Sequence, residues 1–141
     1  MTTFLLKTEP DDYSYADLMR DGKTVWDGVA NPTACQNMRE AKPGDEAFIY
    51  HTGNEKRIAG LARITTKPYA DPKRPDLTKA GDIKFVVFDV EPIAEAMNDV
   101  TLKDIKGDER FAEFLLVKQG RLSAMPVPKK LDGLLRKMAG L

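Results

Sequence analysis

The sequence has very little cysteine and histidine, and this excludes several classes of site. Cys35 is the single cysteine, so it has no partner for an internal disulfide, and His51 is the single histidine. Zinc sites need several cysteine or histidine ligands at characteristic spacings. We therefore expect no metal site, no redox role and no cofactor. Cys35 falls inside an expected helix, which is typical of a small buried residue.

Long apolar runs and a net charge are also missing. Runs such as FVVF at 85–88 are far short of the roughly 20 residues that a membrane helix needs. The N-terminal MTTFLLKTEP has no basic segment before a long apolar one, so we expect a cytoplasmic protein with no membrane partner. The 22 basic residues balance the 22 acidic ones. The chain as a whole therefore has no general attraction for a phosphate backbone.

The charges are less even near the C-terminus. Residues 118–141 carry six basic side chains against Asp132 alone. Two interpretations are open, a basic binding face or ordinary solvated helix faces, and the second is favoured for the run from Lys129 to Lys137.

What the sequence does contain fits one soluble domain that spans residues 1–141. Hydrophobic residues make up 42% and charged residues 31% of the chain, with no low-complexity tract and no fixed repeat. A chain of this length can bury a substantial core. We expect a monomer.

Strand and helix patterns are mixed without a regular alternation. Expected strands are 4–9, the pair 47–51 and 57–65 around the turn TGN, and 83–93, which Pro92 should end; 67–77, with three prolines, should be an exposed loop. Expected helices begin at the caps Ser14 (with Leu18 and Met19 buried), Asn31 and Thr101, and after Pro128, where Leu131, Leu134, Leu135 and Met138 form an apolar stripe. These patterns indicate an α+β fold around a mostly antiparallel, curled sheet.

The only tryptophan, Trp26, lies in the turn-rich stretch KTVWDGVANPTA. A tryptophan in such a stretch can present its ring to a cleft, and a protein that inspects one base needs an aromatic wall for stacking. The alternative is a core anchor beside the second helix, because tryptophan is usually well buried.

Five segments in order carry a family resemblance: FLLKTEPDDYSYADL, VWDGVANPTACQNMR, KPGDEAFIYHTG, IAGLARI and VKQGRLSAMPV. Together they resemble the EVE domain, a member of the PUA-like superfamily related to the YTH readers of methylated adenine. The resemblance implies a PUA-like pseudo-barrel of mostly antiparallel strands with surrounding helices, and a pocket for a modified base in DNA or RNA. Threonine stands where the family usually has serine at 8 and 52. Ala30 replaces an arginine, which removes one phosphate or base contact.

Polar residues near the expected cleft are candidates for the base-binding pocket. The predicted set is Lys7, Thr8, Glu9, Trp26, Asn31, His51, Thr52, Arg121 and Ser123. Structural alternatives stay open: Lys7 and Glu9 as surface residues at a strand end, Asn31 as a helix cap, His51 as a hydrogen-bonded structural residue, and Arg121 in an ion pair. Core or helix-staple roles are favoured for Tyr13, Tyr15 and Tyr50.

Two other classes of function compete with a base reader. Ser14, Ser123, Thr8 or Cys35 would be the nucleophile of a hydrolase with His51 as its base, but none has a nucleophile-elbow setting or a recognisable orienting acid. Glycine-rich phosphate loops are absent. We therefore expect a non-enzymatic module that binds modified DNA or RNA, with a small-molecule-binding domain or a His51 hydrolase as the alternative. A protein-interaction module would show an exposed apolar patch instead of a cleft.

Overall fold

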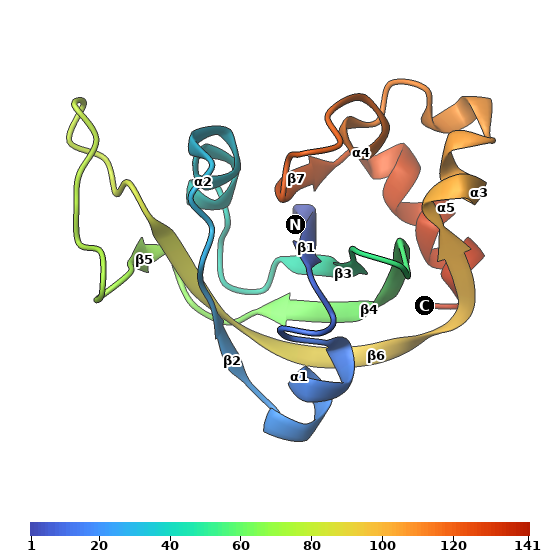
Figure 1. The fold of residues 1–141 in the computed structure, drawn as a ribbon, viewed down its shortest axis with the longest axis horizontal. Helices are drawn as coiled ribbons and strands as arrows, with labels where there is room; N and C mark the ends of the chain where they lie inside the picture. The colour runs from blue at the N-terminus through green and yellow to red at the C-terminus, as the bar shows by residue number, and fades with distance from the viewer.

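The structure is a computed structural model that describes residues 1–141. It confirms the α+β class: one curled seven-stranded sheet with helices packed around it (Figure 1). The strands are β1 Thr3–Thr8, β2 Thr24–Trp26, β3 Glu46–His51, β4 Arg57–Ile64, β5 Tyr69–Ala70, β6 Val86–Thr101 and β7 Ala124–Val127. The helices are α1 Tyr15–Asp21, α2 Pro32–Arg39, α3 Leu102–Lys106, the 3-10 turn η1 Glu109–Phe111, α4 Leu115–Lys118 and α5 Lys129–Ala139.

The order of the strands in the sheet is β2-β6-β4-β3-β1-β7, and β5 pairs separately with β6. Only β1 and β3 run parallel, and every other pair is antiparallel. The hairpin expected from 47–51 and 57–65 is β3–β4. Because β1 lies between β3 and β7, its C-terminal end meets segments from the end of the chain.

The third long strand does not end where the sequence predicted. Pro92 was expected to stop it, but β6 continues to Thr101. Pro92 pairs with Ala62 directly at a register shift between Leu61 and Ala62. A proline has no N–H to donate, and it is tolerated where the ladder is already irregular. The expected exposed loop at 67–77 is also partly wrong, since it contains β5 and the buried Asp71.

The helix starts follow the local signals. The Ser14 hydroxyl accepts from the N–H of Asp17, and the Asp17 carboxylate accepts from the N–H of Ser14, which completes a capping box. Thr101 and Asp104 repeat the arrangement at α3. Gly22 ends α1 with φ 73°, a left-handed conformation that favours glycine. Leu18 is buried as expected, whereas Met19 is 42% exposed, so that part of the prediction is wrong.

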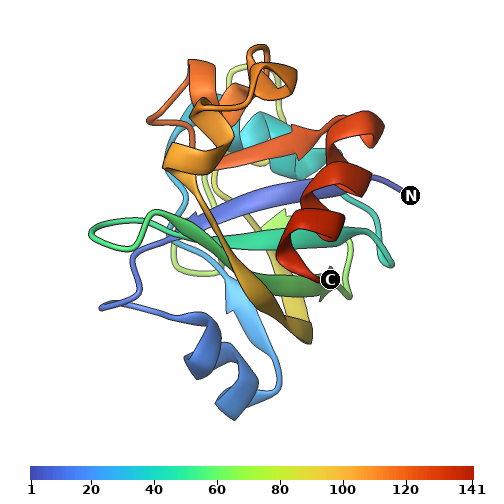
Figure 2. The same cartoon turned by 90° about the vertical axis from the view of Figure 1, so that its right-hand side faces the viewer.

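The core is one cluster of 34 buried residues. Of the apolar stripe on α5, Leu135 is buried and the other three leucine and methionine side chains are half-buried against the cluster. Figure 2 shows α5 beside the ends of β1 and β3, where Arg136 contacts Glu46 at 2.8 Å and the Thr3 hydroxyl donates to Asp132 at 2.8 Å. No helix combines the length and apolar character that crossing a membrane would require.

Candidate functional site

A cleft of about 440 Å³ opens at the C-terminal end of β1. Its lining residues come from four segments, of which only the last is distant in sequence: the end of β1, the turn before α1, β2 with the turn after it, and the residue before β7. They are Lys7, Thr8, Asp12, Tyr13, Thr24, Val25, Trp26, Asp27, Gly28, Val29 and Ser123. The volume lies within the roughly 300–1,000 Å³ usual for small-molecule sites. We call this site the cleft.

Lys7 is held at the edge of the cleft. Its backbone N–H donates to the carbonyl of Ser123 at 2.9 Å, and its Nζ donates to the carbonyl of Gly120 at 2.8 Å. Nζ also lies 5.8 Å from the centre of the Tyr50 ring, which places the cation over an aromatic face. Burial lowers the pKa of Lys7. Lys7 therefore offers its remaining ammonium donors from a fixed position.

The turn between β1 and α1 brings an aromatic ring to the cleft. The Thr8 hydroxyl donates to the carbonyl of Tyr13 at 2.6 Å, which folds this turn back onto the end of the strand. The Tyr13 hydroxyl donates to Asp21 at 2.9 Å, and burial raises the pKa of Tyr13. Tyr13 packs against the core cluster, as predicted, and its half-buried side chain also lines the cleft.

Trp26 serves the core and the cleft together. It lies in β2, where it pairs with Phe88 of β6, and only 6% of its surface is exposed. The exposed remainder lines the cleft beside Val25 and Val29. A three-residue strand such as β2 has no recognisable period in the sequence, so it was interpreted as a turn.

Two carboxylates in the lining were missed by sequence reasoning. Asp12 and Asp27 are exposed, and neither side chain forms a hydrogen bond or an ion pair. Their carboxylate oxygens are therefore free acceptors. Asp27 directly follows Trp26, and this adjacency is the signal that could have found it.

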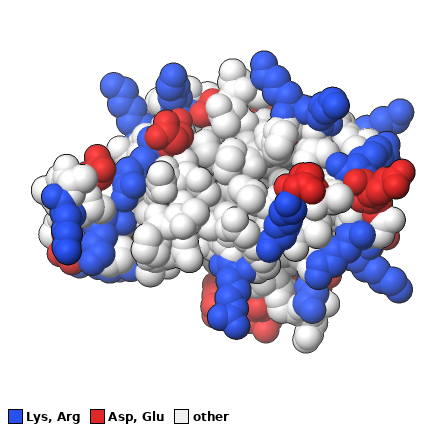
Figure 3. All heavy atoms as spheres, turned by 90° about the horizontal axis from the view of Figure 1, so that it is seen from above, with Lys and Arg blue, Asp and Glu red and all other residues white.

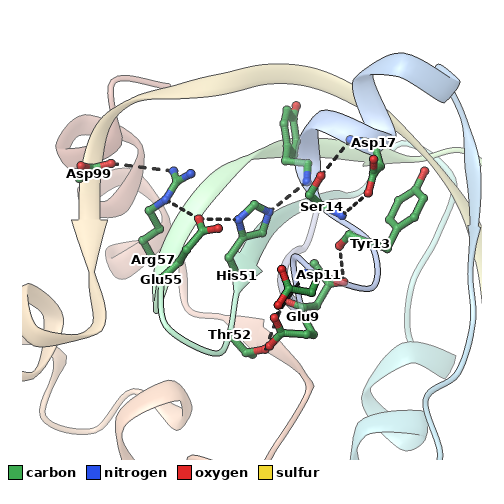
Figure 4. Close-up of polar contacts among 12 residues, drawn as sticks. Glu9, Asp11, Tyr13, Ser14, Asp17, His51, Thr52, Glu55, Arg57 and Asp99 are labelled. Carbon is green, nitrogen blue, oxygen red and sulfur yellow. Dashed lines mark hydrogen bonds and ion pairs between the residues drawn. The ribbon is translucent and has the colours of Figure 1, made fainter.

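Glu9 and Thr52 lie outside the lining of the cleft. They contact each other through the Thr52 hydroxyl, which is 3.2 Å from Oε2 of Glu9, and Oε1 of Glu9 accepts from the N–H of Asp11 at 3.3 Å (Figure 4). The N–H of Thr52 donates to the carbonyl of Thr8 at 2.9 Å. These contacts hold the turn between β1 and α1 against the β3–β4 hairpin.

His51 is also outside the cleft, and only 4% of it is exposed. Its Nε2 accepts from the N–H of Tyr15 at 3.0 Å and its Nδ1 lies 2.9 Å from Glu55 (Figure 4). Because Nε2 is the acceptor, Nδ1 carries the ring proton and donates a hydrogen bond to Glu55. His51 therefore has no free lone pair with which to act as a general base.

Asn31 and Arg121 lie in a second depression of about 290 Å³, lined by Asn31, Thr33, Gln119, Gly120, Arg121 and Leu122. We call it the Arg121 hollow. Oδ1 of Asn31 caps α2 by accepting from the N–H of Ala34 at 3.0 Å, as the structural alternative predicted. Of the nine residues predicted for one pocket, the structure brings Lys7, Thr8, Trp26 and Ser123 to the cleft and places the other five elsewhere.

Neither depression contains a set of metal ligands. No group of three or more His, Cys, Asp or Glu side chains is arranged to hold an ion. Cys35 is fully buried and its Sγ donates to the carbonyl of Val29 at 3.3 Å. The chemistry that the cleft offers is stacking, apolar contact and hydrogen bonding.

The fold is a small α+β pseudo-barrel domain with a cleft at one end of β1. The family model described as EVE domain matches residues 2–138, and the chain therefore belongs to the EVE domain family, as its five segments predicted. Thymocyte nuclear protein 1 from Homo sapiens is 31% identical over 123 residues, which are 73% of this chain and 55% of that protein. The Danio rerio protein of the same name is 32% identical over 153 residues, 88% of this chain and 66% of that one. The chain thus spans between half and two thirds of these relatives.

Solved structures share the fold over almost the whole chain. A protein from Agrobacterium tumefaciens superposes with a TM-score of 0.89 at 29% identity, covering 100% of this chain and 94% of its own. Human thymocyte nuclear protein 1, in a complex with DNA that contains 5-methylcytosine, gives a TM-score of 0.85 at 26% identity and 98% coverage of both chains. The ASCH protein of Zymomonas mobilis, at 15% identity and a TM-score of 0.61, shares the fold alone, covering 96% and 94%.

Proposed function

We propose that the cleft takes one modified base, extruded from a nucleic-acid strand, and that the protein binds it without turnover. The observation that carries this proposal is the composition of the cleft: aromatic and aliphatic walls beside two free carboxylates and one fixed ammonium. A base held out of its stack needs an apolar wall for its faces and polar groups for its edge. The human relative with 5-methylcytosine DNA supports the same class of ligand.

The polar groups favour a base that carries an exocyclic amine. Asp12 and Asp27 can only accept hydrogen bonds while they are ionised, and Lys7 can only donate them. Cytosine offers an amine donor at N4 next to acceptors at N3 and O2, whereas thymine has a carbonyl where the amine would be. We infer that a cytosine-type base fits these groups best. Val25 and Val29 give its modified edge an apolar surface.

The same groups support binding without turnover. The Thr8 hydroxyl is engaged with a carbonyl, and His51 is buried away from the cleft with both ring nitrogens occupied. A hydrolase needs a nucleophile within hydrogen-bond reach of a base. The position of His51 therefore gives no support to the alternative of a hydrolase that uses His51 as its base.

The proposal is tested by titrating the protein with 5-methyl-2′-deoxycytidine, 2′-deoxycytidine and thymidine, followed by NMR so that the contacted residues are identified. We expect the methylated cytosine to bind best and to shift the signals of Tyr13, Trp26 and Asp27. Asp27→Asn should reduce the preference for cytosine over thymine by about tenfold, since one good base-edge contact is worth roughly 1–3 kcal/mol of discrimination. Asp76→Asn is the matched control, because Asp76 is exposed on the loop after β5 and outside the cleft. Equal binding of all three nucleosides, or shifts confined to another surface, would refute the proposal.

A further inference from the structure

We propose that the Arg121 hollow binds a phosphodiester of the strand that supplies the base. This inference rests on the proposed function, because it takes the cleft as the place of the base. It assigns the sugar–phosphate backbone to a separate site whose ligand is a phosphate group. The two sites would have different roles: the cleft would recognise the base, and the Arg121 hollow would bind the backbone of the strand beside it.

Arg121 is the one arginine of this chain whose guanidinium has no partner. Each of the other seven donates to a carboxylate or a backbone carbonyl within the protein. Arg121 is exposed and forms no ion pair, so the predicted structural alternative for it has no support. A guanidinium presents a planar fork of donors that matches two phosphate oxygens. The free fork in the hollow is therefore available to an external anion.

The lining of the Arg121 hollow suits an anion, whereas the lining of the cleft does not. Asn31, Thr33 and Gln119 add neutral side chains that can donate hydrogen bonds, and no acidic residue lines the hollow. In the cleft, Asp12 and Asp27 would repel a phosphate. The charges therefore favour a base in the cleft and a phosphate in the Arg121 hollow.

The two depressions are neighbours. Nζ of Lys7, which lines the cleft, donates at 2.8 Å to the carbonyl of Gly120, which lines the Arg121 hollow. On the other side, Val29 lines the cleft and Asn31, two residues later, lines the hollow. A nucleotide whose base enters the cleft therefore has its backbone next to the hollow.

The walls of the hollow are fixed before any ligand binds. The N–H of Gln119 donates to the carbonyl of Leu115 at 2.7 Å, and the N–H of Leu122 donates to the carbonyl of Gln119 at 3.0 Å, which sets the turn that carries Arg121. The Asn37 amide donates to the carbonyl of Ala124 at 2.8 Å and ties α2 to β7, which lie side by side in Figure 1. A rigid frame lowers the entropy cost of binding.

The surrounding face leaves room for a strand. Figure 3 views the molecule from above the orientation of Figure 1, and it shows Lys and Arg side chains, with Asp and Glu among them, around a largely uncharged centre.

The test compares 5-methyl-2′-deoxycytidine with a trinucleotide that has the same base in its middle, using the wild-type chain, Arg121→Gln and the control Arg110→Gln. Arg110 is an exposed arginine in η1, outside both depressions, and its substitution makes the same change of charge. We expect Arg121→Gln to weaken the affinity for the trinucleotide about tenfold and to leave the affinity for the nucleoside unchanged. The slope of log affinity against log salt should fall by about 0.7, which corresponds to one lost phosphate contact on a single strand. Arg121→Lys should keep the slope and recover part of the affinity.

Failure of the proposed base cleft and failure of the proposed phosphate site would give different results. If no nucleoside binds the wild-type chain, the base cleft is refuted, while the salt slope for the trinucleotide still tests the hollow by itself. Equal weakening of nucleoside and trinucleotide by Arg121→Gln would make Arg121 a base contact and overturn the inference. An unchanged salt slope would also overturn it. Inorganic phosphate distinguishes the source of the anion: if it occupies the hollow without competing with the trinucleotide, the ligand is free phosphate and the strand assignment is wrong.

Discussion

The backbone N–H of Tyr15 donates to Nε2 of His51 across 3.0 Å, and this contact fixes the start of α1 to the end of β3. The other ring nitrogen faces Glu55 at 2.9 Å, and this hydrogen bond from His51 lowers the pKa of Glu55 (Figure 4). The turn that carries Tyr13 into the cleft ends at this helix. The single histidine thus acts on the cleft only through the position of α1.

His51→Ala should therefore destabilise the fold and spare base binding. It leaves the N–H of the buried Tyr15 without an acceptor, which costs about 1–3 kcal/mol of the free energy of unfolding. Urea denaturation measures this change, and nucleoside titration of the folded variant measures binding. Glu55→Gln is the control, because it keeps an acceptor near Nδ1 and should change stability by less than about 1 kcal/mol. Lost binding at unchanged stability would place His51 in the site after all.

Two glycine-to-alanine substitutions should have opposite effects. A Cβ on Gly60 would lie 2.5 Å from the ring of Tyr15, which is fully buried and cannot move aside. We expect Gly60→Ala to lower the free energy of unfolding by about 1–3 kcal/mol through overpacking. A Cβ on Gly133, within α5, meets nothing within 4 Å, so Gly133→Ala should raise the free energy of unfolding by about 0.5–1 kcal/mol. Paired urea curves check both, and a stabilising Gly60→Ala would show that the contact between Tyr15 and Gly60 is loose.

Stability should decline at alkaline pH because folding keeps the tyrosines neutral. The hydrogen bond to Asp89 raises the pKa of Tyr69 from 10.0 to about 12, and burial raises the pKa of Tyr50 to about 12. A group whose pKa is raised by folding adds stability below its unfolded pKa, and that stability is lost as the pH rises through the folded value. The loss should therefore fall between about pH 10 and 12.

Tyrosinate absorbance measured against pH, together with urea curves at each pH, tests this expectation. Tyr69→Phe should remove one late-titrating group and flatten the decline. A Tyr69 that titrates near its ordinary pKa in the folded protein would contradict the contact of 2.6 Å between its hydroxyl and Asp89.

Substitutions of Trp26 should separate stability from binding. Trp26→Ala removes a side chain that is 6% exposed and should cost about 3–5 kcal/mol of stability, so a loss of binding there would have two causes. Trp26→Phe keeps an aromatic face and should weaken nucleoside binding by less than about tenfold. Phe88→Leu is the matched control, since Phe88 pairs with Trp26 but does not line the cleft. Were Phe88→Leu to weaken binding as much as Trp26→Phe, the effect would come from the core.

The sequence by itself determined the elements whose signals are local. The caps Ser14, Asn31 and Thr101 each accept a hydrogen bond from an N–H three residues later, so the helix starts could be predicted from neighbouring residues. The β3–β4 hairpin closes over a short turn and was predicted for the same reason. The order of the five segments also identified the family.

Only the tertiary structure decided the rest, because long-range pairing settles it. β2 and the second half of β6 are strands because partners far along the chain complete their ladders, and Pro92 is tolerated at an irregularity that the pairing with β4 creates. The same packing buried His51, brought Tyr13 to the cleft, and set Arg121 in a hollow of its own. The chemistry of a side chain can be read from its identity, but the group that it faces depends on long-range contacts. Lys7 and Gly120, for example, are 113 positions apart in the sequence and share a hydrogen bond.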